Sequence, residues 1–341
     1  MSSSSPAAAT PPPPEPEEFV LTRHQGRLLI QLPPRLTVAE AVRFREGFSH
    51  WLDHPSPPAA VILDFGRTSL IDSSGIGALV STLKTARSRS IPLRAWSVNR
   101  QVSLALTMTG LDGVLALMPH TEGVSPHPGH KEDQRPPLTH PSVRCPWKRL
   151  LDVVGALVGL AITAVLLVPI AVAIRLDSPG PILFSQVRCG WMGRHFRIWK
   201  FRSMVPNAEL LKGQVANQAE GAFFKNANDP RITRVGRILR KTSLDELPQF
   251  WNVLWGDMSL IGTRPATPDE VNQYAVPNWQ RFDVKPGLSG EWQVSGRSLI
   301  RQFEDVIQLD LRYQRNWSFV YDLKLIVRTV LVIFNRNSGA S

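Results

Sequence analysis

The chain has 341 residues, which is enough for two domains with separate hydrophobic cores, and it carries 39 basic and 28 acidic residues. Residues 1–144 hold 14 basic and 12 acidic residues, so the remaining 25 and 16 give the second part of the chain a net charge of +9. Such a basic domain implies an anionic partner: a nucleic acid, a membrane surface or a phosphorylated substrate. The two cysteines exclude a disulfide framework and indicate a reducing compartment.

Residues 1–18 are proline-rich and contain no apolar segment of the kind found in secretory signals, so we expect a disordered tail. Residues 19–118 have the alternating strand and helix pattern of a small α/β domain. We expect strands at residues 19–23, 27–32, 59–65 and 91–98, and helices at residues 37–51, 74–89 and 100–110. The segment Asp72-Ser73-Ser74 before the second helix either only caps that helix or presents a serine for modification.

Residues 119–146 contain seven prolines and few apolar residues, which indicates a linker. Metal binding by the histidines of this segment is a weaker interpretation, because no rigid spacing holds them together. These histidines are His120, His127, His130 and His140.

An uncharged segment of 22 residues runs from Val153 to Ile174 and is long enough, at about 1.5 Å per residue, to cross a hydrocarbon core of about 30 Å. Basic residues flank both ends, and the positive-inside rule places such residues on one side of a membrane. Pro169 interrupts the helical pattern, so we expect a re-entrant membrane helix over residues 147–175 that enters and leaves through the cytosolic leaflet. A single-pass anchor is the alternative. Because the sequence has one apolar segment of this length, it excludes a multi-span transporter.

The following segment, residues 176–204, interleaves basic and aromatic residues in a strand-like pattern. Beside a membrane helix this pattern favours an interfacial surface over nucleic-acid binding, with aromatic side chains among the headgroups and cations near the lipid phosphates. Lys200 and Arg202 are two residues apart and would share one face of the strand.

Two adjacent carboxylates, Asp245 and Glu246, follow a basic run in the sequence. Ser243 and Glu246 fit a capping box, and the apolar spacing after them is helical, which predicts that both carboxylates lie in the first turn of an amphipathic helix. Pro248 suggests that the regular turns begin nearer residue 246. The carboxylates either only stabilise that helix end or carry out phosphate chemistry together with the neighbouring cations.

Several cations accompany these carboxylates along the chain. Arg240 lies in the preceding basic run, and Arg264 follows the predicted helix. Downstream, the glycines of residues 284–297 allow tight turns that would carry Trp292 and Arg297 towards the same place. Two amphipathic helices are expected to close the chain, and the last of them is apolar enough either to lie in a membrane interface or to pack on the domain core.

From Lys148 to the C-terminus, the sequence resembles the bacterial sugar transferases, which are monotopic polyprenyl-phosphate phosphoglycosyl transferases. Four segments match in order: KRLLDVVG, LDSPGPILFSQVRCGWMGRHFRIWKFRSM, TSLDELPQFWNVLWGDMSLIGTRP and VKPGLSGEWQVSGRS. The resemblance implies an α+β membrane-associated domain over residues 147–341, with Pro169 at the break of a re-entrant helix. At Gly262-Thr263-Arg264-Pro265 the chain departs from the commoner Gly-Pro-Arg-Pro.

This resemblance implies transfer of a phosphosugar from a nucleotide-diphosphate sugar, with UDP-sugars as the expected donors, to undecaprenyl phosphate. The reaction would start the assembly of an exopolysaccharide or another glycoconjugate, and it would use Mg²⁺ and a covalent aspartyl intermediate. Asp245 matches the nucleophile and is the expected magnesium ligand, with Glu246 as its dyad partner. Lys200, Arg202, Arg240 and Arg264 match family positions near the phosphates, and we add Arg297 to these expected phosphate-binding residues.

The implied location is the cytosolic face of a bacterial inner membrane, with no nucleic-acid partner, while the sugar and the oligomeric state stay open.

Residues 19–118 resemble the STAS family through DFGRTSLIDSSGIGALVSTLKTARSRS at residues 64–90. In STAS switches a serine matching Ser73 is phosphorylated by a partner kinase, so the resemblance implies a protein partner for this domain. The alternative function is therefore a membrane-tethered STAS regulator without catalysis, which leaves Asp245 and Glu246 without a role.

Overall fold

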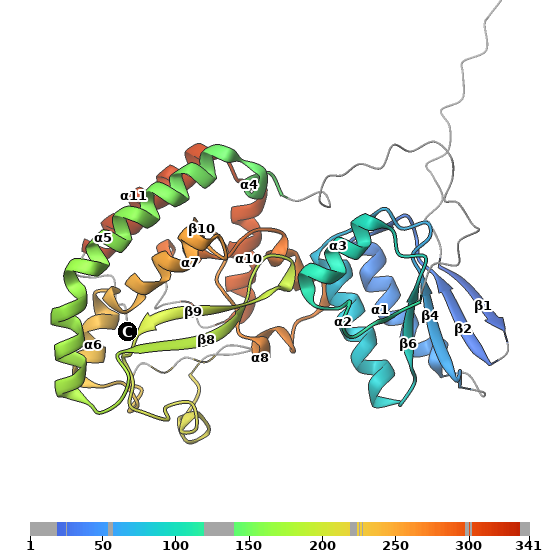
Figure 1. Ribbon diagram of the computed structural model, residues 1–341, viewed down its shortest axis with the longest axis horizontal. Coiled ribbons are helices and arrows are strands. Elements are labelled where there is room, and N and C mark those ends of the chain that lie inside the picture. The colour runs from blue at the N-terminus through green and yellow to red at the C-terminus, as the bar shows by residue number, and fades with distance from the viewer. Residues whose placement is uncertain are drawn as a thin grey trace, which may run out of the picture.

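The computed structural model describes residues 19–24, 26–53, 57–118, 140–218, 224, 226, 228–296, 300 and 302–334. They form an N-terminal α/β domain and a larger C-terminal domain with a long helix along one side (Figure 1). Arg297 and three of the four linker histidines lie outside the described residues.

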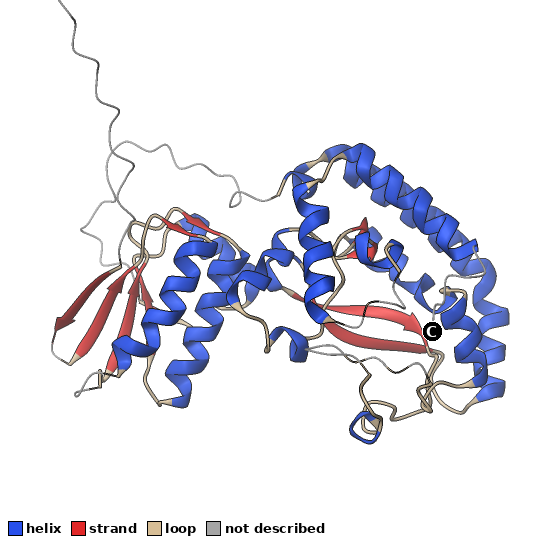
Figure 2. Cartoon of the chain, turned by 180° about the vertical axis from the view of Figure 1, so that it is seen from behind, coloured by secondary structure: helices blue, strands red, loops and turns tan. Residues whose placement is uncertain are grey.

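The N-terminal domain is a layer of helices on a mostly parallel sheet. The sheet has the order β1 (Val20–His24), β2 (Arg27–Gln31), β4 (Ala60–Asp64), β6 (Leu93–Trp96), β7 (Ala116–Leu117), and β3 (Arg35–Leu36) pairs separately with β5 (Leu70–Ile71). Only β1 runs antiparallel to its neighbour in the main sheet. The helices are α1 (Val38–Leu52), α2 (Ser73–Ser88) and α3 (Arg100–Thr109). They lie on the side of the sheet that faces the C-terminal domain, as the views from both sides show (Figure 1 and Figure 2). The predicted α/β fold is confirmed.

Local signals set the ends of these helices. Thr37 and Glu40 form a capping box at the start of α1, and Gly110 ends α3 in the left-handed conformation at φ 71°. At the start of α2, the Asp72 carboxylate accepts a hydrogen bond of 2.8 Å from the backbone N–H of Gly75. Asp72 is therefore a helix cap, as one of the two interpretations of this segment predicts.

The C-terminal domain is built on an antiparallel hairpin, β8 (Leu183–Cys189) and β9 (His195–Phe201), with the short 3₁₀ helix η1 (Trp191–Gly193) at its tip. A second, parallel strand pair joins β10 (Ser259–Ile261) to β11 (Gly287–Ser289). The α-helices are α4 (Pro141–Arg144), α5 (Pro146–Asp177), α6 (Arg234–Lys241), α7 (Phe250–Trp255), α8 (Pro268–Val271), α9 (Glu291–Val294), α10 (Phe303–Arg315) and α11 (Phe319–Phe334). The other 3₁₀ helices are η2 (Lys212–Gln214), η3 (Leu244–Gln249) and η4 (Val276–Asp283).

Helix α5 is the one helix among the described residues that is long and apolar enough to cross a membrane. It is continuous from Pro146 to Asp177, so the predicted break is a bend rather than an interruption, and Figure 1 shows the helix changing direction along its length. Pro169 lies inside the helix, and a proline removes a backbone hydrogen bond there, which gives the bend a physical cause. One side of α5 packs on the domain. The other side exposes apolar side chains: Leu150, Val154, Leu157, Val158, Ile162, Val165, Leu167, Val168, Val172 and Leu176.

Most aromatic residues of the hairpin are buried or half-buried, and only Phe184 of β8 is exposed, so the hairpin does not form the aromatic interfacial surface that the sequence predicted. Phe196 and Phe201 are buried in the C-terminal domain, and Trp191 packs against the core of the N-terminal domain. Two exposed tryptophans are found on α7 instead, where Trp251 and Trp255 stack with ring centroids 5.9 Å apart. The strand prediction is confirmed, but Phe196 and Phe201 pack inside the domain instead of facing a membrane.

The two domains share one hydrophobic cluster. Buried residues of α1 and α2 in the N-terminal domain, such as Phe44 and Leu79, belong to the same cluster as Val276, Trp279 and Phe282 of η4. The N-terminal domain is therefore docked on the C-terminal domain through a continuous apolar core.

Candidate active site

Five of the residues that the sequence singles out line one cavity of about 270 Å³ in the C-terminal domain. Asp245 and Glu246 reach it from η3, Lys200 from β9, Arg240 from the end of α6 and Arg264 from the turn after β10. Carboxylates and cations from four separate segments thus converge on one cavity that is partly open to solvent.

The two carboxylates lie in a 3₁₀ turn. Ser243 adopts the left-handed conformation at φ 56° and makes no side-chain cap, so the predicted capping box is wrong. Pro248 has no N–H to donate to a carbonyl four residues back, and the regular helix α7 begins only at Phe250. The turn buries Asp245, whose exposed fraction is 5%, at the wall of the cavity.

Lys200 forms an ion pair with Glu246, with Nζ 2.8 Å from Oε1. On β9 the buried residues Phe196 and Ile198 alternate with more exposed ones, and Lys200 has the same parity as these two. Because side chains alternate between the faces of a strand, this parity turns Lys200 inward, where it meets the cavity. The strand register therefore holds a cation beside the carboxylate dyad.

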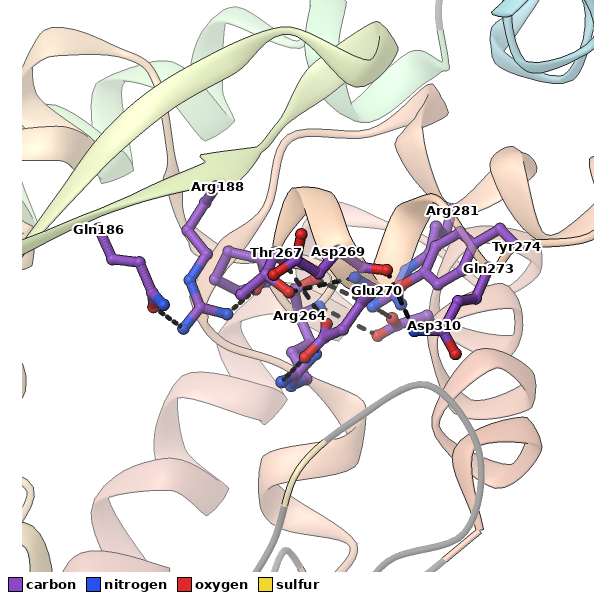
Figure 3. Close-up of polar contacts among 11 residues, drawn as sticks. Gln186, Arg188, Arg264, Thr267, Asp269, Glu270, Gln273, Tyr274, Arg281 and Asp310 are labelled. Atoms are coloured by element: carbon purple, nitrogen blue, oxygen red, sulfur yellow. Dashed lines mark hydrogen bonds and ion pairs between the residues drawn. The ribbon is translucent and has the colours of Figure 1, made fainter. Parts of the chain in front are cut away.

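Arg264 is held by a bidentate ion pair with Glu270, at 2.6 and 3.0 Å (Figure 3). Its guanidinium lies 5.9 Å from the centre of the Trp292 ring. Burial alone would lower the pKa of Arg264, but the Glu270 carboxylate more than offsets this and raises it. Burial likewise acts to raise the pKa of Glu270, and Arg264 brings it below its ordinary value. Both partners stay charged, so Arg264 presents a fixed positive charge to the cavity.

Arg202 does not line the cavity, so the structure does not bring this predicted phosphate-binding residue together with the others. It lies just after the last residue of β9, and its guanidinium donates hydrogen bonds to the carbonyls of Ser178 at 2.6 Å and Pro179 at 2.8 Å. These groups follow the C-terminal end of α5, so Arg202 satisfies carbonyls there. The strand ends before the alternation predicted for Lys200 and Arg202 can place both on one face.

The cavity also contains polar residues that the sequence did not indicate as site residues. Arg188, Gln249 and Gln293 line it, and each has a buried polar atom, respectively Nε, Nε2 and Oε1, without a hydrogen-bond partner among the described residues. Burial and the neighbouring Arg264 lower the pKa of Arg188 to about 10. Buried polar atoms are rarely left unpaired in proteins, so these atoms indicate a cavity that accepts a polar ligand. Position gave a partial signal, since Gln249 is four residues from Asp245 and Gln293 follows Trp292.

The carboxylates of the cavity are suited to a magnesium ion that also binds substrate. No three Asp, Glu, His or Cys side chains within the described residues are arranged to hold a metal by themselves. Asp229, a third acid at the cavity, is committed to a buried ion pair with Arg231 at 2.6 Å. Mg²⁺ generally takes one or two protein carboxylates and completes its coordination with water and substrate phosphates. Asp245 and Glu246 fit such a site.

Ser73 is fully buried between the two domains and is therefore not accessible to a kinase in this arrangement. Its backbone N–H donates to Asp283 Oδ1 at 3.2 Å, and its hydroxyl donates to the sulfur of Met192 at 3.3 Å. Both partners belong to the C-terminal domain. Phosphorylation of Ser73 therefore requires that the domains first separate.

The family comparisons divide the chain at the same place as the structure. Residues 143–336 match the family described as bacterial sugar transferase, and residues 18–123 match the STAS domain. Among solved structures, an anti-sigma factor antagonist from Mycobacterium paratuberculosis is similar over 32% of this chain and 92% of that protein's chain, with 15% sequence identity and a TM-score of 0.29.

Curated relatives match the C-terminal part of the chain. The galactosyl transferase CpsE of Streptococcus agalactiae is 48% identical over 188 residues, which are 54% of this chain and 42% of that protein. An undecaprenyl-phosphate galactose phosphotransferase of Salmonella typhimurium is 41% identical over 198 residues, 56% of this chain and 41% of that protein. The matches thus span about two fifths of the length of these relatives. Because the family match covers more than half of the chain, the protein belongs to the bacterial sugar transferase family and carries a STAS domain before its transferase domain.

Proposed function

We propose that the protein transfers a phosphosugar from a nucleotide-diphosphate sugar to undecaprenyl phosphate and so starts the assembly of a glycan on its lipid carrier, such as an exopolysaccharide. The observation that carries the proposal is the cavity that holds the Asp245-Glu246 dyad together with Lys200, Arg240 and Arg264. Relatives are named for this type of reaction, with galactose in one case and with UDP-glucose as donor in another. A UDP-sugar is therefore the donor class to test first.

The first step places Asp245 as the nucleophile. A carboxylate oxygen of Asp245 attacks the phosphorus that carries the sugar, forming an aspartyl phosphosugar, while the bond to the bridging oxygen breaks and the nucleoside monophosphate leaves with the electron pair. The attack brings one anion towards another, so it requires cations that offset the charge of the diphosphate. Arg264 suits this task because Glu270 fixes its position, and Arg240 faces the same cavity.

The ion pair between Lys200 and Glu246 holds positive charge next to the nucleophile. This contact also fixes the orientation of Glu246, so that the dyad is ordered before substrate arrives. When bound at Asp245 and Glu246, Mg²⁺ would supply further positive charge to the diphosphate of the donor.

In the second step, an oxygen of the lipid phosphate attacks the aspartyl phosphosugar, the bond from phosphorus to Asp245 breaks, and the carboxylate is restored. The acceptor must reach the site from a membrane. The turn that carries the dyad lies against α5, where the Thr163 hydroxyl is 3.4 Å from the Leu247 carbonyl oxygen. The cavity is thus adjacent to the helix that we propose to insert into the bilayer.

We further propose that α5 enters and leaves the membrane through the cytosolic leaflet. Both ends of the helix are attached to the same domain: Lys148 forms a buried ion pair with Asp322 at 2.6 Å, and Asp177 accepts a hydrogen bond of 2.9 Å from the backbone of Val235. A straight span would carry one of these ends across the bilayer and break its contacts. Single-cysteine labels before residue 148 and after residue 180 should therefore both be protected from a reagent that cannot cross the membrane, added to intact cells. Labelling at either end would support a single-pass anchor.

The test of the reaction is to incubate the purified full-length protein with Mg²⁺, undecaprenyl phosphate and a panel of nucleotide-diphosphate sugars while measuring nucleoside monophosphate. We expect release with at least one UDP-sugar, and Asp245→Asn should reduce it at least about a thousandfold because the nucleophile is lost. Asp305→Asn is the matched control, since Asp305 is an exposed acid on α10. Turnover retained by Asp245→Asn would remove Asp245 as the nucleophile. No release with any donor would favour the membrane-tethered STAS regulator.

A further inference from the structure

The STAS domain docks on the transferase domain with the helix face that carries Ser73. Helix α2 packs against η4 and against η1, the tip of the β8–β9 hairpin. Besides the two contacts of Ser73, Lys84 donates a hydrogen bond of 2.6 Å to Asn272 at the edge of this interface. The face from which a STAS partner would be recognised at Ser73 is therefore covered by the chain's own transferase domain.

The centre of this interface is an aromatic ring placed on a glycine. The indole of Trp279 lies so close to Gly77 of α2 that a Cβ atom added there would be 2.5 Å from the ring. Gly193 of η1, with φ at 79°, also lies close to this indole, since a Cβ atom added there would be 2.9 Å from its six-membered ring. A side chain at residue 77 would push Trp279 away, so the docked arrangement depends on the absence of a side chain in α2 at this position.

Another residue of η4 contacts the turn that carries Arg264. Arg281, two residues after Trp279, is fully buried, forms an ion pair with Asp310 and donates a hydrogen bond of 2.7 Å to the hydroxyl of Tyr274 (Figure 3). Its Nη2 atom also donates to the backbone carbonyl of Arg264 at 2.9 Å. A buried guanidinium with these partners holds its neighbours in a defined geometry.

Two further hydrogen bonds attach the turn of Arg264 to the same elements. The Thr263 hydroxyl donates to the backbone carbonyl of Arg281 at 3.2 Å, and the backbone N–H of Arg264 donates to Asp310 at 3.3 Å. The threonine that replaces the commoner proline in this motif thus connects the phosphate-binding turn to η4. One short segment contacts the STAS domain with Trp279 and the turn of Arg264 with Arg281.

We propose that the docked STAS domain positions Arg264 for donor binding, with η4 as the connecting element. Trp279 and Arg281 are positioning residues in this arrangement, since they act through Arg264. The proposal rests on the proposed function, because it assigns Arg264 to the donor phosphates. Under this proposal, phosphorylation of Ser73 would affect donor binding. A phosphate beside Asp283 would oppose docking by charge repulsion, and η4 would then lose its contact with the STAS domain.

The test compares Gly77→Leu with Gly113→Leu in the full-length protein, because a Cβ atom on Gly113 would make only an ordinary van der Waals contact, 3.9 Å from the carbonyl oxygen of Gly110. Hydrogen exchange is measured over residues 276–283 of η4 and residues 262–266 of the Arg264 turn, and KM and kcat are measured for the donor. We expect Gly77→Leu to speed exchange in both segments and to raise KM for the donor about tenfold, a typical size for coupling between sites. Gly113→Leu should leave all of these values unchanged. A loss of folded protein would instead lower the apparent kcat and leave KM as it was.

A second variant, Trp279→Ala, removes the same contact from the transferase side and should have the same effects with the STAS sequence intact. Unchanged protection of β4 and β6 shows in each case that the STAS fold is retained. Faster exchange in η4 with no change in residues 262–266 and no change in KM would overturn the proposal. If the wild-type protein shows no transfer with any donor, the proposed function fails, and the exchange measurement still decides whether docking is coupled to the Arg264 turn.

Discussion

Two short polar segments precede helices in this protein, one in each domain, and their surroundings give them different properties. At Asp72-Ser73, the carboxylate caps α2 and the serine is sealed against the other domain. At Asp245-Glu246, no capping box forms, and the carboxylates face a cavity lined with cations. Both segments have an acid within two residues of a serine before an apolar helix. The difference lies in what packs around them.

The comparison shows how a helix-capping acid differs in its surroundings from the acids that we propose to be catalytic. The Asp72 carboxylate accepts a hydrogen bond from the backbone of its own helix. Around the second pair, the backbone is irregular, with Ser243 in the left-handed region and Pro248 delaying the start of α7. An irregular backbone turns side chains away from the helix they would otherwise cap, and residues held in sparsely populated backbone regions are typical of functional sites.

Among the variants that test this difference between the two segments, a change at Lys200 should lower kcat the most, because Lys200 places a positive charge beside the second segment. Lys200→Met keeps the length of the side chain and removes the charge 2.8 Å from Glu246. We expect kcat for transfer to fall roughly a hundredfold, the size typical of losing one group that stabilises developing charge. Steady-state kinetics with the donor identified for the wild type measure this.

Arg202→Met is the matched variant, two residues further along the chain. It removes hydrogen bonds at the end of α5 and leaves the cavity lining intact, so we expect a lower melting temperature in detergent with kcat per folded molecule nearly unchanged. Two results would contradict this assignment of Lys200 to the active site and of Arg202 to stability: loss of transfer in Arg202→Met without loss of stability, or a wild-type kcat in Lys200→Met.

The parts of the structure that depend on neighbours along the chain could be predicted from the sequence. Thr37 and Gly110 mark helix ends by local hydrogen bonds and backbone conformation, and the α/β order of the first domain follows from apolar periodicity. The dyad and its cations were identified from residue types and the family resemblance. Ser243 was misplaced because its left-handed conformation depends on how the preceding helix and the 3₁₀ turn pack together.

The convergence of three further polar residues on the cavity could not be predicted. Arg188, Gln249 and Gln293 come from three distant segments, and only the folded chain brings their unpaired polar atoms to one cavity. The docking of the domains is another example. The segment between them predicted only a linker, and nothing in the sequence around Gly77 or Trp279 indicated that these two residues pack together. Periodicity reports which side of an element is buried but not what lies against it.

The smallest effect concerns the first segment and its response to pH. Burial and the facing carboxylate of Asp283 raise the pKa of Asp72 to about 7 from an ordinary value of 3.8, and Glu40 of α1 adds to the repulsion, whereas the backbone N–H groups of Gly75 and Ser74 act in the opposite direction. Burial also raises the pKa of Asp283. An acid whose pKa is raised in the docked state holds its proton more tightly there. The docked state is therefore favoured at low pH and loses stability as the pH rises from about 4 to about 7.

Asp72→Asn tests this directly, because asparagine caps a helix as well as aspartate does but cannot ionise. Between pH 5 and pH 7.5, hydrogen exchange in residues 276–283, corrected for the intrinsic effect of pH, should speed up in the wild-type protein and speed up less in Asp72→Asn. Glu46→Gln, at an exposed acid on α1, should behave as the wild type does. An identical pH dependence in Asp72→Asn would mean that ionisation of this carboxyl group is not coupled to docking. The half-buried acid at the start of α2 would then act only as a helix cap.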